Sequence, residues 1–163
     1  MSNVINIGMS QIEVSSKPGT ILVAPSLGSC IGLAIYDPSS KIGGMAHIVL
    51  PDSTKTLKES ENQGKYADTA VPEILKKLFS MGANKNKLVI KIAGGAQMFN
   101  LQQGSNILNI GFRNTIAVKA ALSKEGLELI KADTGGNKGR TFKLDIQTGS
   151  FSVKLIGQNE VEL

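Results

Sequence analysis

The sequence lacks most of the residues from which disulfides, metal sites and aromatic cores are built. Its 163 residues include one cysteine, one histidine and no tryptophan. A single cysteine cannot form a disulfide within the chain, which fits a reducing cytosol. A protein metal site is not expected, because that cysteine and histidine would have only scattered carboxylates beside them. Aromatic residues make up 4% of the chain, so the core must be built from aliphatic side chains.

Long hydrophobic runs and a signal peptide are also missing. The longest apolar run, from Cys30 to Tyr36, has the length of a strand, whereas a membrane span needs about 18 residues. The first residues lack the basic and apolar regions of a secretory signal. These absences predict a soluble cytoplasmic protein with no membrane insertion.

The charge of the chain leaves several kinds of partner open. A formal charge of +5 is compatible with a nucleic acid, an anionic membrane surface or an acidic protein as partner. The lysines are spread along the chain and are not interleaved with aromatic residues, as a nucleic-acid groove would require. We therefore do not expect nucleic acid as a partner.

The pattern of apolar residues predicts an α+β fold, with a mixed β-sheet or sandwich core flanked by two or three helices. We find no internal repeat or linker, so we expect one domain over residues 1–163. The polar segment 52–64 is expected to be an exposed loop, Asp68 or Thr69 to cap the first helix, and Asn114 the second. The expected strands are 4–14 (one or a pair), 20–23, 31–36, 43–51, 88–93, 127–132, 141–146 and 151–156, and the expected helices are 66–81 and 114–123. The turn residues 147–149 predict that the last two strands form a terminal hairpin.

The only cysteine and the only histidine lie on two apolar runs separated by turn residues 37–41, which predicts a β-hairpin. A two-residue turn would place Cys30 directly opposite His47. A register with Cys30 opposite Val49 would make Cys30 and His47 diagonal neighbours on one face. A slip by one residue would put them on opposite faces. The sequence alone leaves the register open.

Cys30 and His47 could form the working pair of a cysteine hydrolase. The histidine would accept the thiol proton, and the backbone of Gly28 and Ser29 could stabilise an oxyanion. The alternative is structural, because a free cysteine is often a small buried apolar group and a lone histidine in a strand is often a core residue. The small residues just before each candidate favour the catalytic interpretation.

Several blocks of the sequence resemble one known family. The segments Leu27–Gly32 and Gly43–Pro51 resemble the signature of the CheD family, the chemoreceptor glutamine deamidases. The resemblance continues nearly end to end through Gly64–Asp68, Lys91–Ala96, Met98–Phe99, Asn109–Gly111, Arg113–Asn114 and Asp133–Gly136. Ordered blocks at compatible spacing are far more specific than a lone Gly-Ser-Cys.

The resemblance implies hydrolytic deamidation of glutamine side chains on methyl-accepting chemotaxis receptors, without a cofactor. It implies that Cys30 is the nucleophile and His47 the base, with a thioester intermediate. The cytoplasmic helices of the receptor would be the protein substrate. A CheC-type phosphatase would be a second partner, which occupies the receptor-binding surface and restrains the enzyme.

One position departs from the family pattern. Many relatives carry a catalytic threonine shortly before the Leu-Gly-Ser-Cys block, where this chain has Ala24, Pro25 and Ser26. Ser26 could orient His47 as the third catalytic member, or a water molecule or backbone carbonyl could do so. Because of this departure, a second function stays open. The protein would then be a binding module that docks on and regulates the phosphatase with little catalysis. A cysteine hydrolase acting on another amide is a third possibility.

Overall fold

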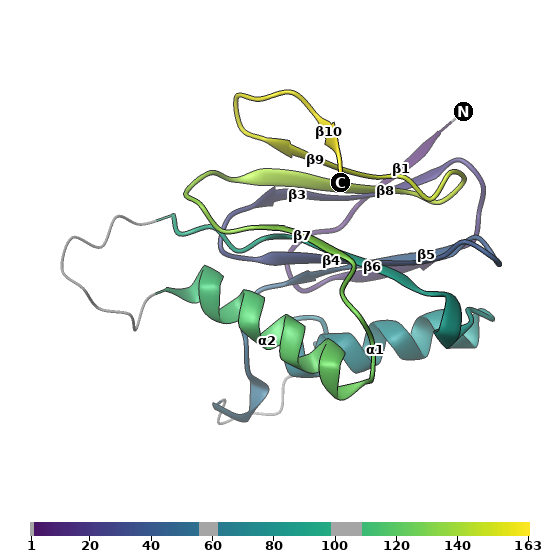
Figure 1. The fold of residues 1–163 in the computed structure, drawn as a ribbon, viewed down its shortest axis with the longest axis horizontal. Helices are drawn as coiled ribbons and strands as arrows, with labels where there is room; N and C mark the ends of the chain where they lie inside the picture. The colour runs from purple at the N-terminus through teal and green to yellow at the C-terminus, as the bar shows by residue number, and fades with distance from the viewer. Residues whose placement is uncertain (1, 56–61, 99–108) are drawn as a thin grey trace.

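Two β-sheets face each other, and two helices cover the outer face of one of them (Figure 1). The structure is a computed structural model that describes residues 2–55, 62–98 and 109–163. Phe99 and part of the expected loop 52–64 lie outside the described residues. Within the described residues each sheet has five strands. The expected α+β fold, with a sandwich of sheets flanked by helices, is confirmed.

The first sheet has the strand order β1-β3-β8-β9-β10 and the second sheet the order β2-β5-β4-β6-β7. The strands of the first sheet are β1 (Asn3–Asn6), β3 (Thr20–Leu27), β8 (Arg140–Asp145), β9 (Phe151–Leu155) and β10 (Val161–Glu162). Those of the second sheet are β2 (Ile12–Ser15), β4 (Ile31–Asp37), β5 (Ile42–Ile48), β6 (Val89–Gly94) and β7 (Lys131–Thr134). The helices are α1 (Ala67–Ser80) and α2 (Ile110–Lys124), with short 3₁₀ helices at Ser53–Lys55 and Lys85–Lys87.

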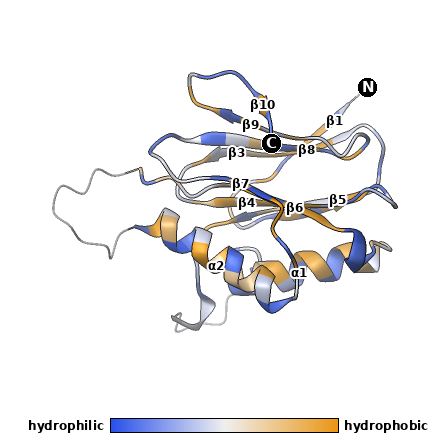
Figure 2. Ribbon diagram, in the orientation of Figure 1, coloured by the Kyte–Doolittle hydropathy of each residue, from blue (hydrophilic) through white to orange (hydrophobic). Residues whose placement is uncertain are grey.

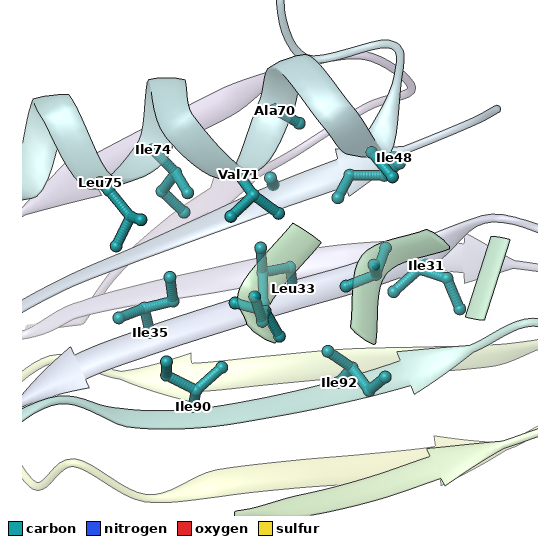
Figure 3. Close-up of a cluster of buried hydrophobic side chains, with 14 of the residues drawn as sticks. Ile31, Leu33, Ile35, Ile48, Ala70, Val71, Ile74, Leu75, Ile90 and Ile92 are labelled. Carbon is teal, nitrogen blue, oxygen red and sulfur yellow. The ribbon is translucent and has the colours of Figure 1, made fainter. Parts of the chain in front are cut away.

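Strand β4 is the centre of the second sheet and is buried on both faces. Ile31, Leu33 and Ile35 point toward the helices, where they meet Val71 and Ile74 of α1 (Figure 3). The alternate residues point toward the first sheet and join a second apolar cluster there. A strand covered on both sides needs apolar residues throughout, which explains the uninterrupted run in the sequence.

Helix α1 closely matches the segment predicted from its apolar spacing. Figure 2 shows long hydrophobic stretches along α1, whereas the loop between β9 and β10 is hydrophilic. The expected cap is wrong, because Tyr66 precedes the helix and makes no side-chain capping bond. The Asp68 carboxylate instead accepts hydrogen bonds from Ser53, at 3.0 Å from the backbone nitrogen and 2.6 Å from Oγ. Asp68 therefore ties the helix to the segment before it.

Four boundaries differ from the prediction by three or more residues, and the first is the end of β5, at Ile48 rather than 51. Helix α2 begins at Ile110 rather than 114, because the Asn109 side chain caps it by accepting from the Phe112 amide at 3.3 Å. Strand β3 continues to Leu27 through a bulge after Ala24, since a bulge tolerates the proline there. Strand β7 covers only 131–134, because the residues before it pack on the helix cluster instead. The N-terminal pair, β1 and β2, divides between the two sheets.

The β4–β5 hairpin and the terminal β8–β9 hairpin are both confirmed. In the β4–β5 hairpin, Asp37 pairs with Ile42, so the loop contains residues 38–41 rather than two residues. The Asp37 carboxylate holds this loop, with 2.8 Å to the Ser39 amide and 2.8 Å to the Ser40 hydroxyl. Short acidic side chains commonly close turns in this way. The loop length sets the register of the whole hairpin.

We expect Ile74→Ala to lower the free energy of unfolding by about 2–5 kcal/mol, because it opens a cavity in the core between α1 and the second sheet. Ile74 is fully buried, whereas Ile116 on the other helix is 50% exposed. Ile116→Ala is therefore the matched control and should cost less than about 1 kcal/mol. Urea denaturation followed by circular dichroism measures both, and equal losses would contradict this description of the core.

Candidate active site

The hairpin register brings Cys30 and His47 to one face of the second sheet. Gly32 pairs directly with His47, and the ladder ends where Ile31 pairs with Ile48. Continued by one residue, this register sets Cys30 opposite Val49. Of the two registers compatible with a working pair, the structure therefore has the diagonal one.

This shared face points toward the first sheet. A Cβ atom added to Gly32 would lie 3.0 Å from a Leu27 side-chain atom and 3.1 Å from Phe142, both of the first sheet. Cys30 packs in the same apolar cluster as these residues. The cysteine and histidine thus lie between the sheets, at the end of β5 and just before the start of β4.

The His47 ring is buried, with 3% of the residue exposed. Its Nδ1 lies 2.8 Å from the Ile7 carbonyl oxygen. A carbonyl can only accept, so Nδ1 carries the proton and the neutral ring has its lone pair on Nε2. Among the described residues, Nε2 has no hydrogen-bond partner. The histidine is therefore oriented through one nitrogen and able to accept a proton at the other.

The segment between β1 and β2 covers this histidine. The Ser10 amide donates to the His47 carbonyl at 2.8 Å, and the His47 amide donates to the Gln11 carbonyl at 3.0 Å. These bonds continue the β2–β5 pairing past Ile12. The same segment places the Ile7 carbonyl oxygen next to Nδ1 of the ring. Burial lowers the pKa of His47, and the hydrogen bond to Ile7 opposes part of that shift.

Cys30 is nearly buried, with 9% of the residue exposed. Burial raises the pKa of its thiol, and its own backbone N–H opposes part of that shift. A raised thiol pKa and a lowered imidazole pKa both favour neutral groups. At neutral pH the two side chains rest as thiol and imidazole rather than as an ion pair, and the imidazole can serve as a general base.

The loop that carries Cys30 is held by its backbone carbonyls. The Gly28 carbonyl accepts a hydrogen bond from the Ala96 amide at 2.8 Å, and the Cys30 carbonyl accepts from the Gly95 amide at 2.9 Å. Both donors come directly after β6. The turn that follows this strand therefore fixes both ends of the Gly28–Cys30 segment.

The carbonyl between them, that of Ser29, accepts from Asn114 Nδ2 of helix α2 at 2.9 Å. In a trans peptide group the carbonyl and the N–H point in opposite directions, and no described peptide bond is cis. The amides of Ser29 and Cys30 therefore point away from β6 and α2. Neither donates to a backbone acceptor of the described residues outside this loop. Two adjacent N–H groups of this kind can stabilise an oxyanion.

Close backbone contact explains the glycine pair after β6. Gly94 has a φ of +116°, and a Cβ atom there would overlap the Cys30 carbonyl oxygen. Gly95 has a φ of +64°, and a Cβ atom there would overlap the Thr115 hydroxyl. Both positions combine a left-handed backbone with no space for a side chain. The pair lets the cysteine loop, β6 and α2 approach one another.

Ser26 does not take part in the hydrogen bond that holds the His47 ring. It sits in the β3 bulge with a φ of +56°, and its side chain is exposed. Ala24 is the buried residue that faces the site, since its Cβ lies 3.5 Å from where a Gly32 Cβ would be. The group that holds His47 Nδ1 in the structure is the Ile7 carbonyl. A catalytic role for Ser26 stays a prediction.

Two groups at this site escaped the sequence analysis. A backbone carbonyl such as that of Ile7 leaves no trace in the residue types. Asn114 was expected as a helix cap, but it lies inside α2 and is fully buried. Its position in the sequence could have identified it, because an asparagine among the buried apolar positions of a helix needs polar partners.

The described residues offer neither a cluster of metal ligands nor a membrane-spanning helix. There, no three histidine, cysteine, aspartate or glutamate side chains gather as a metal ion would need. No helix in the described ranges is long and apolar enough to span a membrane.

Comparison with known proteins gives a consistent result. The family described as "CheD chemotactic sensory transduction" matches residues 49–155. The chain is 45% identical over 159 residues to the "Probable chemoreceptor glutamine deamidase CheD" of Clostridium botulinum (strain Alaska E43 / Type E3), covering 98% of this chain and 97% of that protein. It is 41% identical over 163 residues to the "Chemoreceptor glutamine deamidase CheD" of Halalkalibacterium halodurans, covering 100% of both. With matches of this extent, the chain belongs to the CheD family.

Proposed function

We propose that this protein hydrolyses the side-chain amide of specific glutamines on methyl-accepting chemotaxis receptors, and that Cys30 and His47 carry the reaction. Relatives named as chemoreceptor glutamine deamidases match almost the whole chain, which supports the reaction and the substrate. The observation that carries the residue assignment is the buried histidine ring on the face that Cys30 shares. It is held through Nδ1, and its Nε2 has no hydrogen-bond partner in residues 2–55, 62–98 and 109–163.

The first half of the reaction forms the thioester. His47 Nε2 takes the thiol proton, and the Cys30 sulfur attacks the carboxamide carbon of the glutamine. Negative charge develops on the carboxamide oxygen, where the amides of Ser29 and Cys30 stabilise it. Gly28 just before them packs against Met98, whose Cγ would lie 3.1 Å from a Cβ atom there. His47 then donates its proton to the leaving nitrogen, the C–N bond breaks and ammonia departs.

The second half returns the enzyme to its starting state. Water attacks the thioester carbon while His47 Nε2 accepts its proton. The carbon–sulfur bond breaks, and the receptor leaves with a glutamate in place of the glutamine. The sulfur recovers its proton from the imidazolium. Each cycle consumes one water molecule and releases one ammonia, and needs no cofactor.

The expected surroundings follow from the substrate. The glutamines lie on the cytoplasmic helices of the receptors, so we place the enzyme in the cytoplasm. The formal charge of +5 favours encounter with an acidic surface. A CheC-type phosphatase that competes for the receptor-binding surface stays a prediction from the family resemblance.

A second candidate function makes this docking the main role, with little catalysis. The feature that favours it is the segment 24–26, where the family resemblance implies a catalytic threonine and this chain has none. Ala24, the buried residue of that segment, offers no polar side chain. Binding to receptor and phosphatase without any turnover would support this function over deamidation.

The central test is intact-mass measurement of receptor cytoplasmic fragments incubated with the protein. Each deamidation adds about one dalton, because an amide becomes an acid. We expect Cys30→Ala to reduce the rate by about 10⁴-fold or more, since it removes the nucleophile. The fold should survive, which circular dichroism can verify. A Cys30→Ala protein with wild-type activity would exclude this mechanism.

The pH dependence should report the lowered pKa of His47. Only the neutral ring can accept the thiol proton, so activity falls as pH drops through that pKa. We expect kcat/KM to hold down to a pH of about 6.5, the ordinary histidine value, and to decline only below it. Initial rates between about pH 5 and 8 measure this, and an acid limb clearly above the ordinary value would contradict it.

The same pKa shift has a consequence for stability. Below the ordinary pKa the unfolded chain binds a proton at His47 that the folded chain resists, so the free energy of unfolding should fall as pH drops through that range. His47→Gln should remove this part of the pH dependence. Denaturation midpoints of both proteins at several pH values provide the comparison.

Ser26→Ala distinguishes the two groups that could orient His47. Because Nδ1 already bonds to the Ile7 carbonyl and the Ser26 side chain is exposed, we expect kcat to stay within about threefold of wild type. A loss of 100-fold or more, on the scale of a removed catalytic group, would make Ser26 the third catalytic member. The intact-mass assay above measures both results.

A further inference from the structure

Asn114 is a polar residue in an apolar position. It is fully buried in helix α2, on the same helix face as Val118 and Leu122, which pack in the core between helices and second sheet. Asparagine is a weak helix former, and burying its carboxamide is costly unless every polar atom finds a partner. Its Oδ1 has no hydrogen-bond partner in the described part of the chain. Stability of the helix therefore does not explain this residue.

Two hydrogen bonds from its side-chain amide nitrogen explain why an asparagine stands here. Asn114 Nδ2 donates to the Ser29 carbonyl at 2.9 Å and to the Val49 carbonyl at 2.9 Å. A side-chain NH₂ group has two hydrogens, so one planar group can hold two carbonyls at once, which a hydroxyl cannot do. The two acceptors belong to different segments. One precedes Cys30 directly, and the other lies two residues after His47.

These contacts occur where the two strands separate. The last pair between β4 and β5 is Ile31 with Ile48. Beyond it, the amides of Val49 and Leu50 both turn to the Lys65 carbonyl, each at 3.0 Å. The β4–β5 ladder therefore stops before it reaches Cys30. Asn114 spans the gap and links the two segments in its place.

The bond to Ser29 also fixes the direction of the Cys30 amide. The Ser29 carbonyl and the Cys30 N–H belong to one peptide group and point in opposite directions. With the carbonyl held by Asn114, the N–H is aimed away from α2. The same side chain thus controls the spacing of the cysteine and histidine segments and the aim of one oxyanion donor.

We infer that Asn114 is a positioning residue, whose carboxamide sets the separation of Cys30 and His47 and the direction of the Cys30 amide. The inference rests on the proposed function for its catalytic meaning. It does not require Asn114 to touch the substrate.

The test compares Asn114→Ala with Leu122→Ala. Both remove a buried side chain from the same helix face, but Leu122 lies two turns away from the cysteine loop and bonds to neither segment. Asn114→Leu provides a third protein, which keeps the number and branching of the side-chain heavy atoms and removes the polar contacts. Thermal unfolding identifies the temperature at which all three proteins and the wild type are folded.

One readout needs no receptor. Cys30 is the only cysteine, so alkylation by iodoacetamide reports its reactivity alone. The rate rises with pH in every variant because the thiolate is the reactive form. In the wild type His47 should add a second pH dependence as it loses its proton, and His47→Gln should remove that second dependence. We expect both Asn114 variants to resemble His47→Gln, while Leu122→Ala resembles the wild type. Asn114 variants with the wild-type pH profile would overturn the inference.

The second readout is receptor deamidation. We expect kcat to fall about 100-fold in the Asn114 variants, as for catalytic groups misplaced by about 1 Å, with KM changed less than threefold. Leu122→Ala should keep kcat near the wild-type value. Equal losses in all three variants would reduce Asn114 to a structural role and overturn the inference. If the wild type fails to deamidate receptors while alkylation still depends on Asn114, the proposed function fails and the positioning role stands.

Discussion

The four-residue loop that joins β4 to β5 is the constraint on which the site depends. Asp37 binds the amide and hydroxyl of Ser39 and the hydroxyl of Ser40, and it also accepts from the Asn84 amide at 2.7 Å. This loop sets Gly32 opposite His47 at the far end of the hairpin. Strand side chains alternate between faces, so a shift by one residue would turn the histidine toward the helices. A carboxylate at one end of the hairpin thus decides which layer contains the histidine at the other.

Burial between the sheets gives this pair its chemical character. An exposed cysteine–histidine pair could rest as thiolate and imidazolium, but removal from water disfavours both charges. The pKa of the thiol is raised and the pKa of the imidazole is lowered. A neutral thiol is also oxidised less readily than a thiolate. In the proposed reaction the thiol proton must move to His47, where the Ile7 carbonyl would stabilise the imidazolium that forms.

Sequence patterns predicted the elements better than the site. The helical spacing of α1 and the two hairpins depend on neighbouring residues, and these predictions are confirmed. The start of α2 was wrong, since either of two asparagines could cap it and only tertiary packing shows that Asn114 is needed inside. The register was left open because it depends on how the Asp37 side chain folds back on its loop. Cys30 and His47 were recognisable as unique residues, whereas the backbone carbonyl that holds the ring has no sequence signal.

In the described part of the chain, the hydrogen bonds to the carbonyls of the cysteine loop come from the side opposite to the amides of Ser29 and Cys30. Three successive carbonyls are held by Gly95, Ala96 and Asn114, which lie after β6 and in α2. Each of these bonds turns an N–H of the loop or of β4 in the opposite direction. Donors fixed before the substrate arrives need no reorganisation when negative charge develops, and this is the main advantage of a rigid oxyanion site. In the proposed reaction, support from the same side would fill the space that the glutamine carboxamide needs. The close approach of β6 and α2, which requires glycine at positions 94 and 95, therefore fixes the donors on which the proposed reaction relies.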